Sequence, residues 1–234
     1  MPFSCVAGGY DRELEKAEAE FKRAIELNPS YPSAHQWYAQ ALECENRKDE
    51  AWVEIRKALE LSPLSLIINT NVADAYFWSG EYDRGAEQAR KVIDMDPNFP
   101  SSYQALIFNL LRMSKFGEAR KILEPLSKVT DSVDQKMMGA YIDAYEGKGE
   151  EARRKLKELS DSEFRGKVSP YFLAGTYARL GDKEKTFEML EKAYESHDRY
   201  ILFMGIDYDM EAIRQDPRYS VMLGRIGLAE RLRP

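Results

Sequence analysis

The sequence has few of the residues that metal centres and covalent catalysis require. Its 234 residues include two cysteines, Cys5 and Cys44, and two histidines, His35 and His197. The cysteine spacing matches no zinc motif or disulfide framework, and we expect free thiols in a reducing compartment. The H-E-x-x-H, paired C-x-x-C and G-x-S-x-G motifs are absent. We therefore predict a protein that is not an enzyme and that holds neither a metal nor a cofactor.

An excess of basic charge and a long apolar run are also missing. The formal net charge is −6, whereas general binding of nucleic acid requires a basic face, so no direct nucleic-acid partner is expected. No apolar run approaches the roughly 18 residues of a membrane span, and residues 1–9 lack the charged and apolar regions of a signal peptide. We expect no membrane insertion and a cytoplasmic location, or an extracytoplasmic one if a membrane span precedes this sequence.

What the sequence does contain is a regular repeat. Pro29, Pro63 and Pro97 are spaced by 34 residues (63 − 29 and 97 − 63). A small residue near the start of each expected second helix keeps this interval, with one step of 33: Ala17, Ala51, Gly85, Ala119, Ala152 and Thr186. Mostly apolar residues follow four and seven positions after each of these, which places them on one helical face. A fixed period of this length is the signature of stacked helical repeats.

The pattern resembles the tetratricopeptide repeat family over roughly residues 10–196. The resemblance rests on these columns, on the helix ends A-I-E-L-N-P and A-L-E-L-S-P, and on the aromatic residues Tyr76 and Tyr177 in first helices. It implies an all-α fold, a right-handed superhelical solenoid of antiparallel helix hairpins, with about five repeats and a C-terminal helical cap. The chain is similar to the repeat arrays found at the C-terminal ends of bacterial multidomain regulators and signalling proteins.

The repeat pattern also predicts the domain organisation. Residues 1–10 are expected to be a flexible tail, residues 11–196 the solenoid, and residues 197–234 capping helices that cover the last repeat. The solenoid is expected to divide into an incomplete first repeat, 11–29, and the repeats 30–63, 64–97, 98–131, 132–165 and 166–196. Pro125 falls near the end of an expected helix and should end or kink it.

The first repeat lacks its first helix, which exposes an apolar face at the N-terminal end. A solenoid end of this kind requires a cover. One alternative is that the chain is the C-terminal part of a longer protein. Another is a homodimer formed through the helix expected from Asp11 to Leu27. In a third, residues 2–6 fold back over the face.

The expected binding site is the concave surface lined by the first helices. In the family, inward-facing positions follow set spacings, and carrying them over gives an aromatic groove: Thr70, Asp74, Phe77, Trp78, Gln104, Phe108, Arg112, Met137, Tyr141 and Tyr145. Aromatic and methionine side chains suit an apolar or helical peptide. Two alternatives stay open: the stripe packs against neighbouring repeats, or the cap of the protein itself fills the groove.

A clamp for the C-terminal carboxylate of chaperone tails is not expected. Such a clamp requires lysine, arginine and asparagine donors in the groove. The corresponding positions hold Gln36, Gln40, Ser101 and Ala105, and only Asn71 agrees. We therefore predict a non-catalytic scaffold that binds a protein or peptide partner. The alternative is an assembly or sensory arm of a larger bacterial transcriptional regulator or signalling protein that self-associates through its end helices.

Overall fold

The computed structural model describes residues 10–161 and 168–229, and this part of the chain is helical throughout. Five antiparallel pairs follow the single helix α1 (Tyr10–Leu27). The pairs are α2 (Pro32–Cys44) with α3 (Lys48–Leu61), α4 (Leu66–Ser79) with α5 (Tyr82–Met95), α6 (Pro100–Arg112) with α7 (Phe116–Ser127), α8 (Ser132–Tyr145) with α9 (Gly149–Asp161), and α10 (Pro170–Arg179) with α11 (Lys183–Glu195). Two short 3₁₀ helices, η1 (Arg199–Phe203) and η2 (Tyr208–Ile213), and α12 (Pro217–Arg225) complete the chain. The predicted all-α solenoid is confirmed.

Local sequence explains where these helices begin and end. Pro32, Pro100 and Pro170 each occupy the first turn of a helix, where a missing amide donor costs nothing. Each hairpin turn contains a residue in the left-handed conformation: Asn46, Gly80, Ser114, Gly147 and Gly181. At Gly80, with φ of 81°, the glycine avoids the steric strain that a side chain would meet. α7 includes Pro125 and ends two residues later, as the sequence predicts.

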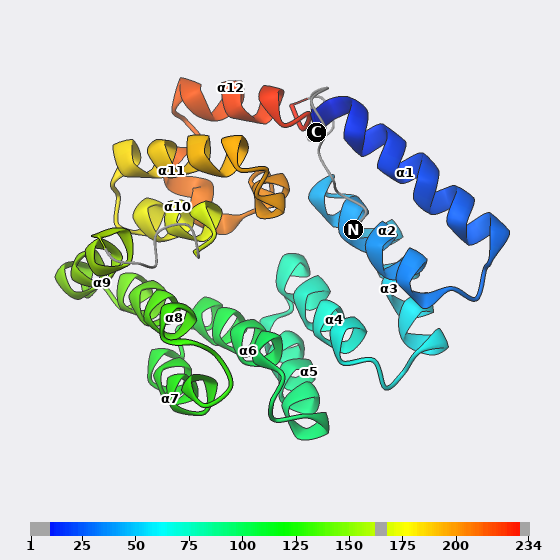
Figure 1. Ribbon diagram of the computed structural model, residues 1–234, viewed down its shortest axis with the longest axis horizontal. Helices are drawn as coiled ribbons and strands as arrows, with labels where there is room; N and C mark the ends of the chain where they lie inside the picture. The colour runs from blue at the N-terminus through cyan, green and yellow to red at the C-terminus, as the bar shows by residue number, and fades with distance from the viewer. Residues whose placement is uncertain (1–9, 162–167, 230–234) are drawn as a thin grey trace.

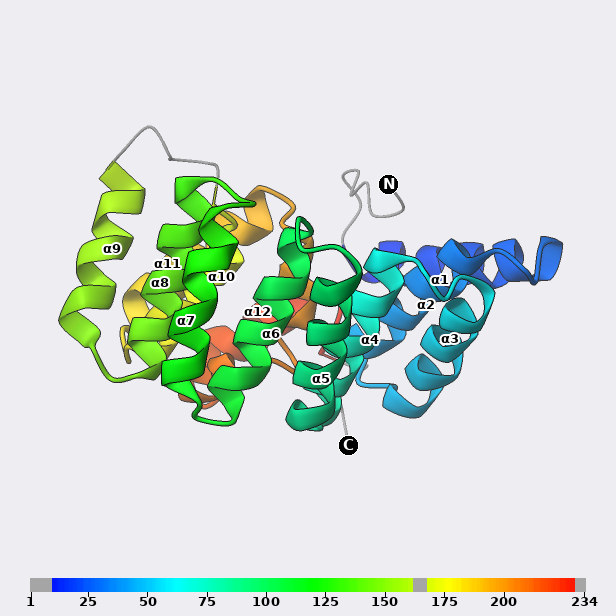
Figure 2. The ribbon, with the colours of Figure 1, turned by 90° about the horizontal axis from the view of Figure 1, so that it is seen from below.

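The paired helices form two layers. The first helices α2, α4, α6, α8 and α10 contact one another in succession, and each packs on its own second helix. They form the inner layer of the arc in Figure 1, and Figure 2 shows the helices from α4 to α9 side by side. The small residues of the repeat column, such as Ala51, Ala119 and Ala152, are buried, because they allow close approach between helices. No helix in the described ranges is both long and apolar enough to cross a bilayer.

The apolar face of α1 is covered within the chain. Ala17 and Phe21 pack with Tyr38 and Leu42 of α2, and Leu14 joins the buried cluster that the C-terminal helices form. This agrees with Figure 1, in which α12 approaches the start of α1 and nearly closes the arc. Of the large apolar side chains described in α1, only Leu27 is exposed, at 70%. The predicted cover by residues 2–6 lies outside the described residues.

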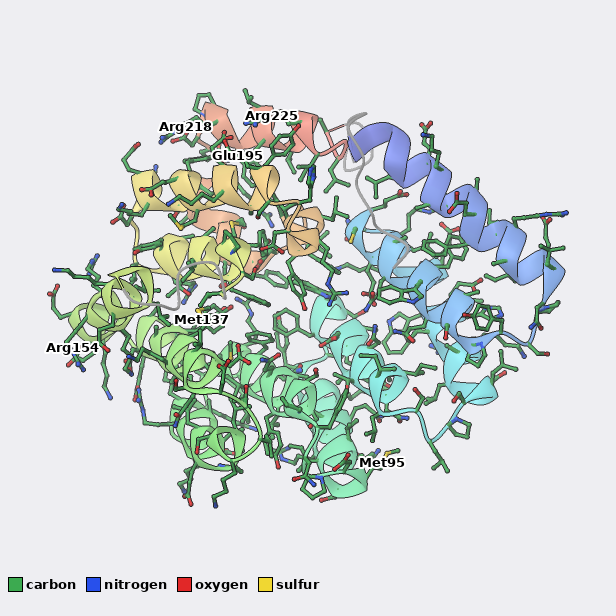
Figure 3. All side chains as sticks on the ribbon, in the orientation of Figure 1. Met95, Met137, Arg154, Glu195, Arg218 and Arg225 are labelled. Atoms are coloured by element: carbon green, nitrogen blue, oxygen red, sulfur yellow. The ribbon has the colours of Figure 1, made fainter. Side chains whose placement is uncertain are left out.

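The C-terminal segment covers more than the last repeat. α12 lies against α11, through ion pairs of Arg218 with Glu184 and of Arg225 with Glu191. Figure 3 labels Arg218 and Arg225 on α12. However, η1 and η2 contact α10 and η1 also contacts α2, at the opposite end of the inner layer. Residues 199–213, which we call the capping segment, therefore run along the concave face of the solenoid.

Candidate functional site

The inner face encloses a cavity of about 290 Å³ between the first helices and the capping segment. Helices α2, α4 and α6 form one side, and η1 with residues of α8 and α10 forms the other. Seven of the ten predicted groove residues line this cavity: Thr70, Asp74, Phe77, Trp78, Gln104, Phe108 and Tyr141. The spacing of Thr70, Asp74 and Phe77 by four and three residues places them on one face of α4.

The other three predicted groove residues, Arg112, Met137 and Tyr145, contact other parts of the chain. The Arg112 guanidinium lies 4.2 Å from the centre of the Tyr208 ring. The Tyr145 hydroxyl donates a hydrogen bond of 2.5 Å to Asp209. Met137, on α8 (Figure 3), is buried in the core. These three side chains therefore do not line the cavity.

The aromatic stripe is packed on one side and open on the other. Trp78 stacks on Phe203 of η1, with ring centres 5.2 Å apart and an angle of 14° between the planes. Phe108 contacts Tyr141 edge-on at 5.5 Å and stacks near Phe172 at 5.9 Å. The capping segment thus covers part of the predicted groove, while Trp78, Phe108 and Phe203 still border the remaining cavity.

Buried hydrogen bonds hold the capping segment in place. Asp209 of η2 accepts hydrogen bonds from Tyr141 and Tyr145 of α8, and Asp207 accepts one of 2.7 Å from Tyr171 of α10. Burial raises the pKa of Asp207 to about 7 and also raises the pKa of Asp209, although the tyrosine hydroxyls oppose the shift in both. The part of the concave face formed by α8 and α10 is therefore filled by the chain itself.

The other end of the cavity is acidic. Glu43 of α2 and Asp74 of α4 both line it. Burial, followed by the negative charge of Asp74, raises the pKa of Glu43 well above its usual range. Burial raises the pKa of Asp74 to about 7, although the charge of Arg199 lowers it in part. Both carboxyl groups therefore lie in an environment that disfavours an uncompensated negative charge.

The cavity offers little for covalent or metal chemistry. The thiol of Cys44 lines it, but burial raises the pKa of this thiol and keeps it protonated, which makes it a weak nucleophile. No histidine lines the cavity. Within the described residues, no group of histidine, cysteine, aspartate and glutamate side chains is arranged to hold a metal ion.

Sequence reasoning missed the contributions of the capping segment. Arg199, Tyr200, Phe203 and Asp207 line the cavity. The sequence left open that the cap fills the groove, but it did not assign these residues to the site. The available signal was the apolar run at residues 200–204, which indicated a buried segment. Glu43 of α2 also lines the cavity and is buried, although it is not among the predicted groove residues.

Comparison with known proteins shows that the chain resembles several solved structures in its fold. No protein-family model matches the sequence, and neither does any curated protein. The solved structure of TTC0263, a tetratricopeptide repeat protein of Thermus thermophilus, is 16% identical, covers 82% of this chain and 99% of its own, and has a TM-score of 0.58. A tetratricopeptide repeat protein of Parabacteroides merdae is 16% identical over 94% of this chain and 93% of its own, with a TM-score of 0.56.

A third solved structure, of PilF from Pseudomonas aeruginosa, is 17% identical over 82% of this chain and 88% of its own, with a TM-score of 0.55. At such identities these likenesses concern the fold alone. They agree with the 34-residue period and with the five helix pairs observed in the structure. The chain therefore has the tetratricopeptide repeat fold.

Proposed function

We propose that the chain is a non-catalytic protein-interaction scaffold that binds a peptide segment or helix of a partner protein at the cavity of its inner face. Solenoids of stacked repeats present extended concave surfaces, and they use these surfaces for binding. A fold alone does not assign a function. The proposal therefore depends on the site that this chain builds on the fold.

The observation that supports the proposal is the cavity that remains beside the capping segment. Its volume of about 290 Å³ is near the lower end of the range for ligand pockets, roughly 300–1,000 Å³. Aromatic rings form its walls and polar side chains lie between them, which is the usual composition of a binding pocket. A cavity of this size accommodates one or two anchoring side chains, so the rest of the partner would lie along α2, α4 and α6.

A cavity-filling variant tests this proposal. Peptides are first selected from a displayed random library on the full chain. Their affinities are then measured by calorimetry on the chain carrying Gln104→Trp, because Gln104 lines the cavity between α4 and the capping segment. We expect the affinity to fall about tenfold or more, since hot-spot pockets carry most of the binding energy.

The matched control is Val53→Trp. Val53 lies on α3 and is 66% exposed, so the same indole is added on the outer layer without a change of charge. The control variant should bind as the unmodified chain does. If no selected peptide distinguishes the two variants, the cavity is not the binding site and the proposal fails.

The alternative function, an assembly arm that self-associates through its end helices, has less support. It depends on an unpartnered apolar face at α1. That face is covered by α2 and by the C-terminal cluster, as Ala17, Phe21 and Leu14 show. A homodimer through α1 would therefore have little apolar surface on which to form.

A further inference from the structure

Glu43 is a buried carboxyl group and Asp74 a half-buried one, and both face the same cavity. Glu43 is 5% exposed, near the end of α2, and Asp74 faces the same cavity from α4. Neither carboxyl has a hydrogen bond or an ion pair with any described residue. Removing a carboxylate from water without such a partner is costly. The described part of the chain therefore offers these two groups no hydrogen-bond donor and no ion-pair partner, and only the charge of Arg199 acts on Asp74 from a distance.

Other buried carboxyl groups of the chain are compensated. Asp143 is paired with Arg120 and Lys155, and Asp209 accepts hydrogen bonds from two tyrosine hydroxyls. The chain thus supplies donors to buried acids in its core and at the capping segment. This contrast indicates that Glu43 and Asp74 interact with a group of a bound ligand.

Arg199 lines the same cavity, but it is not an ion-pair partner of Glu43 or Asp74. Its guanidinium lies 4.6 Å from the centre of the Tyr200 ring and donates a hydrogen bond of 2.8 Å to the Tyr200 hydroxyl. No ion pair joins it to Glu43 or Asp74 in the described part of the chain. Four carboxyl groups and one guanidinium line the cavity. Asp207 and Asp209 already accept hydrogen bonds from tyrosine hydroxyls, so a bound cation would chiefly stabilise the ionised forms of Glu43 and Asp74.

An independent observation also indicates a ligand. Asn71 is 3% exposed and lies one turn before Asp74, on the face of α4 that lines the cavity. Its side-chain nitrogen Nδ2 is buried and has no hydrogen-bond partner. A buried amide donor without an acceptor is uncommon in folded proteins. A peptide carbonyl placed in the cavity would provide that acceptor.

The aromatic wall suits the aliphatic part of a basic side chain. Phe77, Trp78 and Phe203 border the cavity beside Asp74. Long basic side chains bury their methylene groups against apolar surface while the charged end finds a polar partner, and a cation near an aromatic face is further stabilised.

We propose, building on the peptide-binding function above, that the cavity recognises a lysine or arginine side chain of the partner peptide. The cation lies between Glu43 and Asp74, the methylene groups lie along Trp78, and the Asn71 amide donates to a carbonyl of the bound peptide. The recognised ligand is thus a basic peptide and not an acidic tail.

The test uses the peptides selected on the full chain. We expect them to carry a lysine or arginine, and replacing it with norleucine, which keeps a straight aliphatic stem but removes the charge, should lower affinity on the order of tenfold or more. The chain carrying Glu43→Gln with Asp74→Asn should lose affinity for the basic peptide by a similar factor and should no longer distinguish it from the norleucine peptide. The control, Asp83→Asn with Glu87→Gln, makes the same charge change on the exposed face of α5 and should bind normally.

The stability of the ligand-free variant separates a binding role from a structural one. Glu43→Gln with Asp74→Asn removes two uncompensated carboxyl groups, so its urea midpoint at pH 8 should equal or exceed that of the unmodified chain. One outcome would overturn the cation proposal and leave the scaffold function standing. In it, Gln104→Trp blocks the selected peptides, but these peptides carry no basic residue and bind equally well to the Glu43→Gln, Asp74→Asn variant. If no bound peptide is blocked by Gln104→Trp, both proposals fail.

Discussion

Replacing Gly85 with alanine is expected to destabilise the solenoid through a single contact. Gly85 occupies the small-residue column at the start of α5, and a Cβ added there would lie 2.7 Å from Cγ of Asn109 on α6 and closer still to its Oδ1. Real Cβ atoms do not approach other heavy atoms so closely. Asn109 is fully buried, and its Nδ2 donates a hydrogen bond of 2.9 Å to the Ala105 carbonyl. The added methyl group therefore requires the asparagine side chain, or the helix that carries it, to move.

The size of the effect follows from opposing contributions. Alanine is favoured over glycine within a helix by roughly 0.5–1 kcal/mol. Overpacking a buried site costs about 1–3 kcal/mol, and disturbing the Asn109 hydrogen bond costs about 1 kcal/mol more. We expect Gly85→Ala to lower the free energy of unfolding by about 1–3 kcal/mol, measured by urea denaturation followed by circular dichroism.

The preceding repeat shows which second substitution should relieve the clash between the methyl group of Gly85→Ala and Asn109. Ala51 and Ala75 occupy the equivalent positions one repeat earlier (75 − 51 and 109 − 85 are both 24). The double variant Gly85→Ala with Asn109→Ala reproduces that alanine pair. It should recover most of the stability lost by Gly85→Ala, and a double-mutant cycle should show coupling of about 1 kcal/mol or more. Additive effects, or a Gly85→Ala chain as stable as the original, would refute the steric argument.

Three further predictions follow from the ends of the chain and from the cap. Burial alone would raise the pKa of Glu18, but the hydrogen bonds from Lys22, Arg47 and Tyr38 outweigh it and lower this pKa from 4.5 to about 2. The ionised Glu18 therefore stabilises the folded chain by about 1–3 kcal/mol. This stabilisation is present above pH 4.5 and is lost as the pH falls towards 2. Urea midpoints across this range should fall for the original chain, and Glu18→Gln should make the fall smaller, since the remaining dependence comes from other ion-paired carboxyl groups such as Asp143 and Asp216. Tyr145→Phe removes a donor to the buried Asp209 carboxyl and should cost about 1.5–3 kcal/mol in the same assay; an unchanged midpoint would show that this bond does not hold the capping segment. Light scattering after size exclusion should give the chain mass, 27.0 kDa, at all concentrations, because α1 is covered, and a stable dimer would contradict that explanation.

The sequence predicts the helix pairs well because they depend on local signals. Pro32 and Pro100 begin helices where the pattern places them, and the helix breaks fall at Asn46, Gly80 and Ser114. The 34-residue period also relates each repeat to its neighbour, because neighbouring repeats pack in the same way. This is why the inward-facing residues of α4 and α6 were predictable from spacing.

The path of the capping segment was not predictable in the same way. Phe203 stacks on Trp78, which lies 125 residues earlier in the chain (203 − 78), and a repeat period carries no information about a contact outside the repeats. The apolar run at residues 200–204 indicated a buried segment but not the surface that buries it. For the same reason Arg112 and Tyr145 were expected in an open groove, whereas they contact Tyr208 and Asp209.

The capping segment determines what kind of partner the solenoid can bind. Without it, the groove of the first helices would extend to Arg112 and Tyr145, which now contact Tyr208 and Asp209. Because Asp207 and Asp209 are fixed by tyrosines of α8 and α10, the segment acts as a wall of the site and not as a bound peptide that a partner displaces. The proposed binding site is therefore the surface of α2, α4 and α6, where Glu43 and Asp74 have no hydrogen bond or ion pair and Asn71 lacks an acceptor among the described residues. On this proposal, the specificity of the chain arises where its regular repeats meet the capping segment, which does not follow the repeat.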